Sequence, residues 1–279
     1  MNTNTVVNVA SVPHRSPFRY PGGKTWLVPH VRKWLKSLPN RPNDFVEPFA
    51  GGGIVGLSML FDGLTDHTTL IELDEDIAAV WRVILNGEAK KLAEQIESFE
   101  VSVDAVRSIL DTAPINLLDQ AFATIIRNRM QRGGIMAKGA SLMKNGENGK
   151  GLLSRWYPET LKQRILDISS KKESINFIAG DGIEYLKAVS GEKDICCLID
   201  PPYTVAGKRL YAHADIDHEG LFRVTSKIKG DFLMTYDNAE PVLELAKKFG
   251  FDTQTIAMKN THHSVMSELL IGRNLQWVR

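Results

Sequence analysis

The sequence predicts an α/β fold, in which a mainly parallel sheet is interrupted by an inserted, mainly helical segment. Three observations support this prediction. A succession of strand, glycine turn, helix and strand occupies residues 44–85, strand-like runs return after residue 171, and the stretch between them is basic and different in character. We therefore expect a discontinuous sheet domain, residues 1–85 and 171–279, and an inserted domain at 86–170.

The first α/β unit covers residues 44–85. Residues 44–49 are expected to form a strand, the glycines at 51–53 a turn, and residues 54–60, with apolar side chains at helical spacing, a helix. A second strand is expected at 68–73 and a second helix at 75–85. Repetition of this unit builds a parallel sheet.

The insert is distinguished by its charge. The whole chain has a formal net charge of +1, but residues 127–164 contain nine Lys and Arg against two Glu, so this segment carries +7 and the rest −6. Such a basic block predicts a surface for nucleic-acid phosphates, although a solvated helical face can have the same composition. Within the insert we expect a helix at 117–130 and a mobile hairpin or loop in the polar stretch 144–151.

The strands that complete the sheet are expected at 175–179, 195–199 and 232–235. A final pair, 252–258 and 267–271, is expected to form an antiparallel hairpin. Asp237 and Asn238 follow an apolar strand and are expected near the site, without an assigned role, because strand ends line the binding crevice of such sheets.

The bulk properties are those of a globular protein, with 43% hydrophobic and 24% charged residues over 279 positions. No apolar run approaches the roughly 20 residues that span a bilayer, and the first twelve residues lack the pattern of a secretory signal. Cys196 and Cys197 are neighbours in an apolar run, so no disulfide framework is expected. These features predict a cytoplasmic protein without membrane association.

Two glycine loops are candidates for cofactor binding. The first, at 51–53, lets backbone amides approach a ligand, and Glu72 follows about twenty residues later at a strand end, as in nucleotide-binding folds where an acid binds ribose hydroxyls. The second is the loop from Arg19 to Lys24, where Tyr20 could stack on a ring or cover a sulfonium and Lys24 could meet a carboxylate. Each loop taken alone is also compatible with a plain turn.

Asp200-Pro201-Pro202-Tyr203 follows a strand that is expected to be buried. The prolines stiffen the loop, so the Asp200 carboxylate and a fixed carbonyl could accept the two hydrogens of an amino group while Tyr203 stacks on the base that carries it. Positioning and electrostatics would then supply most of the rate, without a covalent nucleophile. The alternative is a strand terminator with an incidental Asp-Pro turn.

Four motifs together resemble the Dam-like adenine-N6 DNA methyltransferases, over nearly the whole chain. They are Tyr20-Pro21-Gly22-Gly23-Lys24, Val46-Glu47-Pro48-Phe49-Ala50-Gly51-Gly52-Gly53, Ile71-Glu72-Leu73-Asp74 and Asp200-Pro201-Pro202-Tyr203. The resemblance implies a Rossmann-like methyltransferase sheet with helices on both faces, an inserted target-recognition domain, S-adenosylmethionine as cofactor, and methyl transfer to the amino group of a flipped adenine.

The resemblance also assigns residues. Asp200, Pro201, Pro202 and Tyr203 are expected to be catalytic, and the cofactor-binding set is Tyr20, Lys24, Glu47, Pro48, Phe49, Gly51, Gly53, Glu72, Asp181 and Asp200. The DNA-binding set is Arg127, Asn128, Arg129, Arg132, Lys138, Lys144 and Arg155. Double-stranded DNA is the expected partner, together with a cognate restriction nuclease or another defence or mobile-element component, in a bacterial or phage-encoded protein.

Several alternatives were weighed. Cys196 and Cys197 are expected to be buried inert thiols rather than nucleophiles, and His213, His218, His262 and His263 lack the spacing of a metal site, so no metal is expected. A catalytically inactive DNA-binding regulator is disfavoured by the intact loop at Asp200. Cytosine or a protein glutamine as acceptor is disfavoured by Asp in the first position of that loop, and RNA is a further alternative substrate.

Overall fold

The computed structural model describes residues 11–19, 23–132, 140–146, 149–202, 216–259 and 265–279. Its centre is one seven-stranded sheet in the order β3-β2-β1-β4-β5-β7-β6, in which the first five strands are parallel and β7 runs antiparallel to both of its neighbours. The strands are β1 (Asp44–Glu47), β2 (His67–Glu72), β3 (Ile175–Ala179), β4 (Ile195–Ile199), β5 (Asp231–Asp237), β6 (Asp252–Lys259) and β7 (Val265–Gly272). The predicted strands and the final hairpin are confirmed, with bounds that shift by up to two residues.

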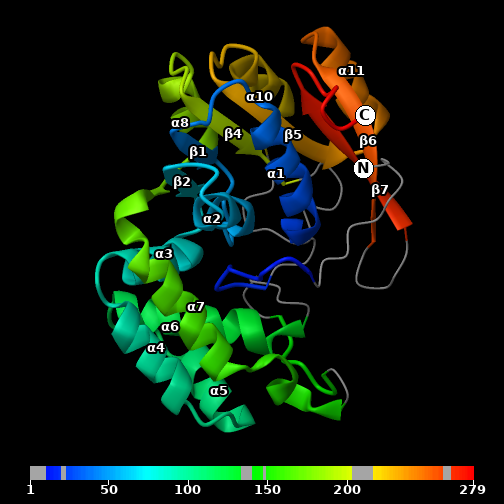
Figure 1. Cartoon of the computed structure of the whole chain (residues 1–279). Helices are drawn as coiled ribbons and strands as arrows, with labels where there is room; N and C mark the ends of the chain where they lie inside the picture. The colour runs from blue at the N-terminus through cyan, green and yellow to red at the C-terminus, as the bar shows by residue number, and fades with distance from the viewer. Residues whose placement is uncertain (1–10, 20–22, 133–139, 147–148, 203–215, 260–264) are drawn as a thin grey trace.

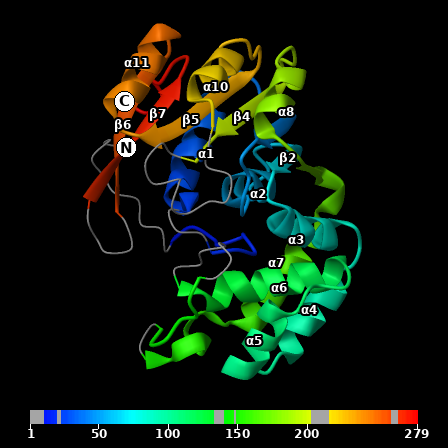
Figure 2. The ribbon, with the colours of Figure 1, turned by 180° about the vertical axis from the view of Figure 1, so that it is seen from behind.

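Both faces of the sheet are covered by helices. One face packs against α1 (Val28–Ser37), which the short helix η2 (Lys24–Leu27) precedes, and α2 (Ile54–Phe61), and the other against α8 (Gly182–Val189), α10 (His218–Thr225) and α11 (Glu240–Lys248). Figures 1 and 2 show these two layers from opposite sides. Neighbouring strand residues alternate between the two cores, as Cys196 and Cys197 do, because side chains point to opposite faces along a strand. This arrangement confirms the predicted Rossmann-like α/β class.

Most of the remaining helices form a helical layer, which lies below the sheet in Figure 1. They are α4 (Ala89–Ser98), α5 (Val103–Asp111), α6 (Leu117–Met130) and α7 (Pro158–Ser170), with the short helices η5 (Gly151–Arg155) and η6 (Lys172–Ser174). Their apolar side chains form one cluster with α3 (Glu75–Leu85) and with Leu70 and Ile175 of the sheet. The stretch expected to be an insert is therefore helical and continuous with the core on the β2–β3 side. None of the helices in the described ranges is both long and apolar enough to cross a membrane.

The topology determines where a site can form. Strand β1 lies between β2 and β4. After β1 the chain adds β2 and β3 on one side, and it then crosses to add β4 and β5 on the other. The carboxyl ends of the five parallel strands meet at the same edge, and ligands of such sheets bind beside the strand at which the order reverses. Glu47, Glu72 and Asp200, at or directly after the ends of β1, β2 and β4, are therefore brought to one edge.

Candidate active site

Asp200 is held at the end of β4 by two side chains from other elements. The Thr235 hydroxyl on β5 donates a 2.7 Å hydrogen bond to Asp200 Oδ1, and Lys24 Nζ at the start of η2 lies 3.1 Å from the same oxygen. Pro201 is buried and Pro202 partly exposed beside it. The acid of the predicted catalytic loop and the lysine of the second glycine loop, 176 positions apart in the chain, are thus in direct contact.

Lys24 contacts a second acid. Its Nζ lies 3.5 Å from Glu268 Oε1, on β7. Glu268 is only 7% exposed and is paired in the sheet with Asp237, the last residue of β5. Because β7 is antiparallel, its beginning lies at the carboxyl edge of the parallel strands, and this places Glu268 beside Lys24 and Asp200.

The first glycine loop connects β1 to α2 in a conformation that other residues rarely adopt. Gly51 and Gly53 have φ of 48° and 57°, and a Cβ on Gly53 would lie 3.0 Å from Leu70 Cδ1. Trp81 Nε1 donates a 2.9 Å hydrogen bond to the Gly51 carbonyl. The loop is therefore fixed from α3. Backbone conformation favours glycine at both positions, and the space beside Gly53 excludes a larger residue there.

Glu72, at the end of β2, faces this loop. Its carboxylate accepts hydrogen bonds of 2.8 Å from the Gly51 amide and 2.9 Å from the Asp74 amide. Burial raises the pKa of Glu72 to about 7, although both amides oppose the rise. The side chain is partly exposed. A carboxylate in this setting retains lone pairs that can accept hydrogen bonds from ribose hydroxyls.

Glu47 is buried and accepts a hydrogen bond from the Gly56 amide in the first turn of α2. Burial raises the pKa of Glu47 to about 8, the Gly56 amide opposes the rise, and the charge of Asp200 adds to it. Pro48 is buried and Phe49 partly exposed next to it. Glu47 therefore satisfies a backbone amide of the first turn of α2, at the end of β1.

Asp181 caps α8 by accepting hydrogen bonds of 2.7 Å from the Ile183 amide and 3.3 Å from the Glu184 amide. The neighbouring Gly182 lies so close to the β1–α2 loop that a Cβ there would be 1.9 Å from the Pro48 carbonyl oxygen. This contact brings the exposed Asp181 to the same edge of the sheet as Glu72.

The predicted DNA-binding residues of α6 are largely engaged inside the molecule. Arg127 pairs with Asp76 on α3 at 2.7 Å, and the fully buried Asn128 both accepts from the Arg19 amide and donates to the Arg19 carbonyl. Arg129, also buried, donates to the Pro17 carbonyl at 2.7 Å. Asn128 and Arg129 thus hold residues 17–19 against the helical layer, and DNA binding stays a prediction for them.

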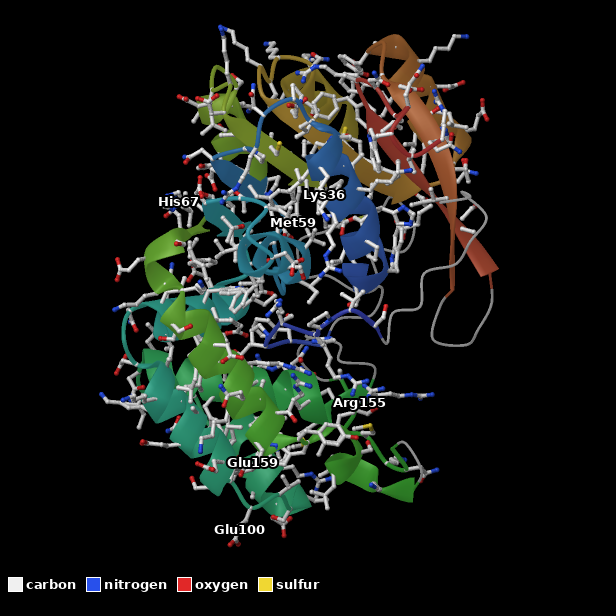
Figure 3. All side chains as sticks on the ribbon, viewed as in Figure 1. Lys36, Met59, His67, Glu100, Arg155 and Glu159 are labelled. Carbon is white, nitrogen blue, oxygen red and sulfur yellow. The ribbon has the colours of Figure 1, made fainter. Side chains whose placement is uncertain are left out.

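Four arginines come together where this N-terminal segment meets α6 and α7; we call Arg19, Arg129, Arg155 and Arg164 the arginine cluster. Burial, followed by the charges of Arg164, Arg19 and Arg155, lowers the pKa of Arg129, and burial and then Arg19 lower that of Arg164. Arg19, Arg155 and Arg164 are partly exposed. Figure 3 shows Arg155 on the side of the helical layer that faces the sheet. Guanidinium groups stay charged under such shifts, so positive charge is concentrated here.

The two other described DNA-binding candidates are exposed. Arg132 and Ser141 are joined by a backbone hydrogen bond of 3.0 Å, in a short antiparallel contact that also pairs Gln131 with Leu142. Lys144 lines a hollow of about 1220 Å³ between α5, α6 and η5, away from the strand ends. The hollow belongs to the helical layer and holds none of the residues that surround Asp200.

Some predicted residues lie outside the described ranges. These are Tyr20, Lys138 and Tyr203 of the predicted sites, and His213, His262 and His263. Cys196 and Cys197 are free and buried, and burial raises the pKa of both thiols, that of Cys197 to about 12. His218 shares a 3.0 Å hydrogen bond with the Tyr236 hydroxyl. In the part of the chain that the structure describes, no group of three or more His, Cys, Asp or Glu could hold a metal ion.

Thr235 and Glu268 are residues of the site that sequence reasoning missed. Each is a buried polar residue within an otherwise apolar strand, in Leu233-Met234-Thr235-Tyr236 and Glu268-Leu269-Leu270-Ile271. A polar side chain in such a run is the signal that could have singled them out.

Residues 20–110 match the family of D12 class N6 adenine-specific DNA methyltransferases. No protein of curated function matches the chain. Among solved structures, an rRNA methyltransferase from Streptomyces viridochromogenes has a TM-score of 0.46 at 13% identity, over 98% of this chain and 93% of that one. Spermidine synthase from Thermotoga maritima has a TM-score of 0.44 at 11% identity, over 90% of this chain, which spans 59% of the synthase. The TrmK protein of M. capricolum, solved with S-adenosyl-homocysteine, has a TM-score of 0.38 at 8% identity, over 88% of this chain and 68% of that one.

The family match contains the two glycine loops and Glu72, and the strand order places Asp200 beside them. The resemblance inferred from the four motifs is therefore confirmed over residues 20–110, and with it a methyltransferase activity for the domain. Over residues 20–110 the chain therefore matches the D12 class N6 adenine-specific DNA methyltransferases, the kind of family that its motifs predict.

Proposed function

We propose that the protein is a site-specific DNA adenine methyltransferase, which moves a methyl group from S-adenosylmethionine to the N6 amino group of adenine. The observation that carries the proposal is the placement of Asp200. It is held at the end of β4 by Lys24 and Thr235, directly before two prolines, in a chain whose residues 20–110 match the adenine-specific family.

The residues at the strand ends fit such a cofactor. The glycine loop at 51–53 leaves backbone accessible without side chains, and Glu72 beside it offers a carboxylate to ribose hydroxyls. Asp181, exposed at the neighbouring strand end, is the candidate for the adenine ring of the cofactor. When bound, S-adenosylmethionine supplies an electrophilic methyl group on a positively charged sulfur.

Asp200 orients the amino group that accepts the methyl. Its carboxylate accepts a hydrogen bond from the target amino group and turns the nitrogen lone pair toward the methyl carbon. The Pro201 carbonyl is the second acceptor, held by a chain that two prolines stiffen. In this transfer a bond would form between the amino nitrogen and the methyl carbon while the methyl–sulfur bond breaks, with S-adenosylhomocysteine as the leaving group. The nitrogen is positively charged until it releases one proton to water. A carboxylate beside it stabilises that charge while it develops.

Double-stranded DNA is the proposed partner, because the adenine must be turned out of the duplex to reach Asp200. The arginine cluster, Arg132 and Lys144 offer positive charge for the phosphates. The other proposed partner is a cognate restriction nuclease or another defence or mobile-element component.

The test is the transfer of labelled methyl from S-adenosylmethionine to unmethylated duplex DNA, followed by digestion and mass spectrometry of the nucleosides. N6-methyladenine is expected from the native protein, and none from Asp200→Ala, which should still bind DNA. Methylated cytosine would overturn the base assignment, and methylation of RNA alone would overturn the polymer. Binding without any methylation would indicate a regulator instead of an enzyme.

A further inference from the structure

Glu268 is a buried acid that the proposed chemistry has not used. Lys24 Nζ lies 3.1 Å from Asp200 Oδ1 and 3.5 Å from Glu268 Oε1, so the ammonium is shared by carboxylates of β4 and β7. The exposed fraction of Glu268 is 7%, and the three residues that follow it on β7 are apolar and buried. An acid is costly in such a strand unless its charge is paired, and Lys24 provides that charge.

The position of Lys24 creates an electrostatic conflict in the proposed reaction. The target nitrogen acquires positive charge, and a negative Asp200 stabilises it. An ammonium in contact with the same carboxylate weakens that effect, because it opposes positive charge developing nearby. A second negative charge in contact with the ammonium removes the conflict.

We propose that Glu268 is a positioning residue that holds Lys24 and neutralises its charge, so that Asp200 presents its negative charge to the target amino group. This inference rests on the proposed methyl transfer. With both acids ionised, Lys24, Asp200 and Glu268 together carry a net charge of −1, which suits a cationic transition state.

Two other acids lie near this site, Glu47 and Asp237. Burial raises the pKa of Glu47 to about 8, so this acid is mostly neutral at pH 7. Asp237 is opposite Glu268 in the β5–β7 register, on the strand that supplies Thr235. The carboxylates of Asp200 and Glu268 both lie within 4 Å of Lys24 Nζ.

The experiment compares Glu268→Gln with the native enzyme. Gln keeps an oxygen that can accept from Lys24 but removes the charge. We expect kcat to fall about 10- to 100-fold, with cofactor and DNA dissociation constants by calorimetry within about threefold of native. Glu268→Asp, which restores the charge, should recover most of kcat. Glu244→Gln, an exposed acid on α11, is the matched control and should leave kcat unchanged.

A double-mutant cycle with Lys24→Met separates this role from a structural ion pair. If Glu268 acts by neutralising Lys24, Glu268→Gln should not lower kcat further once Lys24 is Met. An equal loss of kcat in both backgrounds would overturn the inference, as would an unchanged kcat in Glu268→Gln. If that single variant fails to fold, Lys24→Met/Glu268→Gln, in which both partners of the Lys24–Glu268 pair are uncharged, is compared with Lys24→Met by the same criterion. Absence of methylation by the native protein would instead overturn the proposed function.

Discussion

The hydroxyl of Thr235 donates a 2.7 Å hydrogen bond to Asp200 Oδ1 between adjacent strands. The β4–β5 register pairs Ile199 with Met234 as its last pair. The residues that follow them, Asp200 and Thr235, therefore lie side by side. Thr235 is fully buried and so has little freedom to move. The contact therefore fixes the direction in which the Asp200 carboxylate points.

We predict that Thr235→Val lowers kcat about tenfold, because a hydrogen bond to a charged group that orients a catalytic carboxylate is lost. Val has nearly the same shape, so the fold and cofactor affinity should be preserved. Thr235→Ser, which keeps the hydroxyl, is the matched control. Steady-state kinetics with duplex DNA measures both variants; a native kcat in Thr235→Val, or an equal loss in Thr235→Ser, would contradict the role of the hydrogen bond.

The local elements were predictable from the sequence because short-range patterns determine them. Helical spacing at 75–85 and 117–130 gave helices with these same bounds in the structure, and the apolar runs 175–179 and 195–199 are strands. The glycines at 51 and 53 were expected in a turn, and both have positive φ. Glu72 was expected at the end of the next strand, and it is the last residue of β2, where it accepts a hydrogen bond from the Gly51 amide.

The contacts between distant elements were not predictable in the same way. Asn128 was expected to contact DNA, but its amide binds the backbone of Arg19, 109 residues away. Thr235 and Glu268 contact Asp200 and Lys24 only because β5 and β7 follow β4 in the sheet order. Propensity and spacing describe one element at a time, whereas these pairs depend on sheet order and register.

Gly182→Ala is predicted to destabilise the protein. The new Cβ would lie 1.9 Å from the Pro48 carbonyl oxygen, so the β1–α2 loop and α8 must separate. We expect a loss of about 1–3 kcal/mol in the free energy of unfolding, and weaker cofactor binding, because Glu72 and Asp181 flank this contact. Gly191→Ala is the control, since its Cβ would meet nothing within 4 Å. Denaturant titration and calorimetry measure the two effects, and equal stability of the two variants would contradict the prediction.

The stability of the protein should depend on pH through Glu47. Its pKa is about 8 in the folded chain and 4.5 when unfolded, so between these values the folded state binds more protons and stability falls as pH rises. We expect the native protein to lose about 3 kcal/mol relative to Glu47→Gln between pH 5 and pH 8. Denaturant titrations at the two pH values measure this difference, and Glu244→Gln should show none. A constant difference between native and Glu47→Gln at both pH values would contradict the shifted pKa.

The arginine cluster is predicted to contact DNA phosphates. Each phosphate neutralised by a cation releases counterions, so removing one contact lowers the slope of log K against log salt by about 0.9. Arg155→Gln and Arg164→Gln, both partly exposed, should each reduce the slope by about that amount and weaken binding similarly on different sequences. The control is Lys36→Gln on α1, an exposed cation that Figure 3 shows well away from Arg155. Fluorescence anisotropy from 50 to 200 mM salt measures the slopes. Unchanged slopes in both Arg variants, or an equal reduction in Lys36→Gln, would mean that DNA does not lie along this cluster.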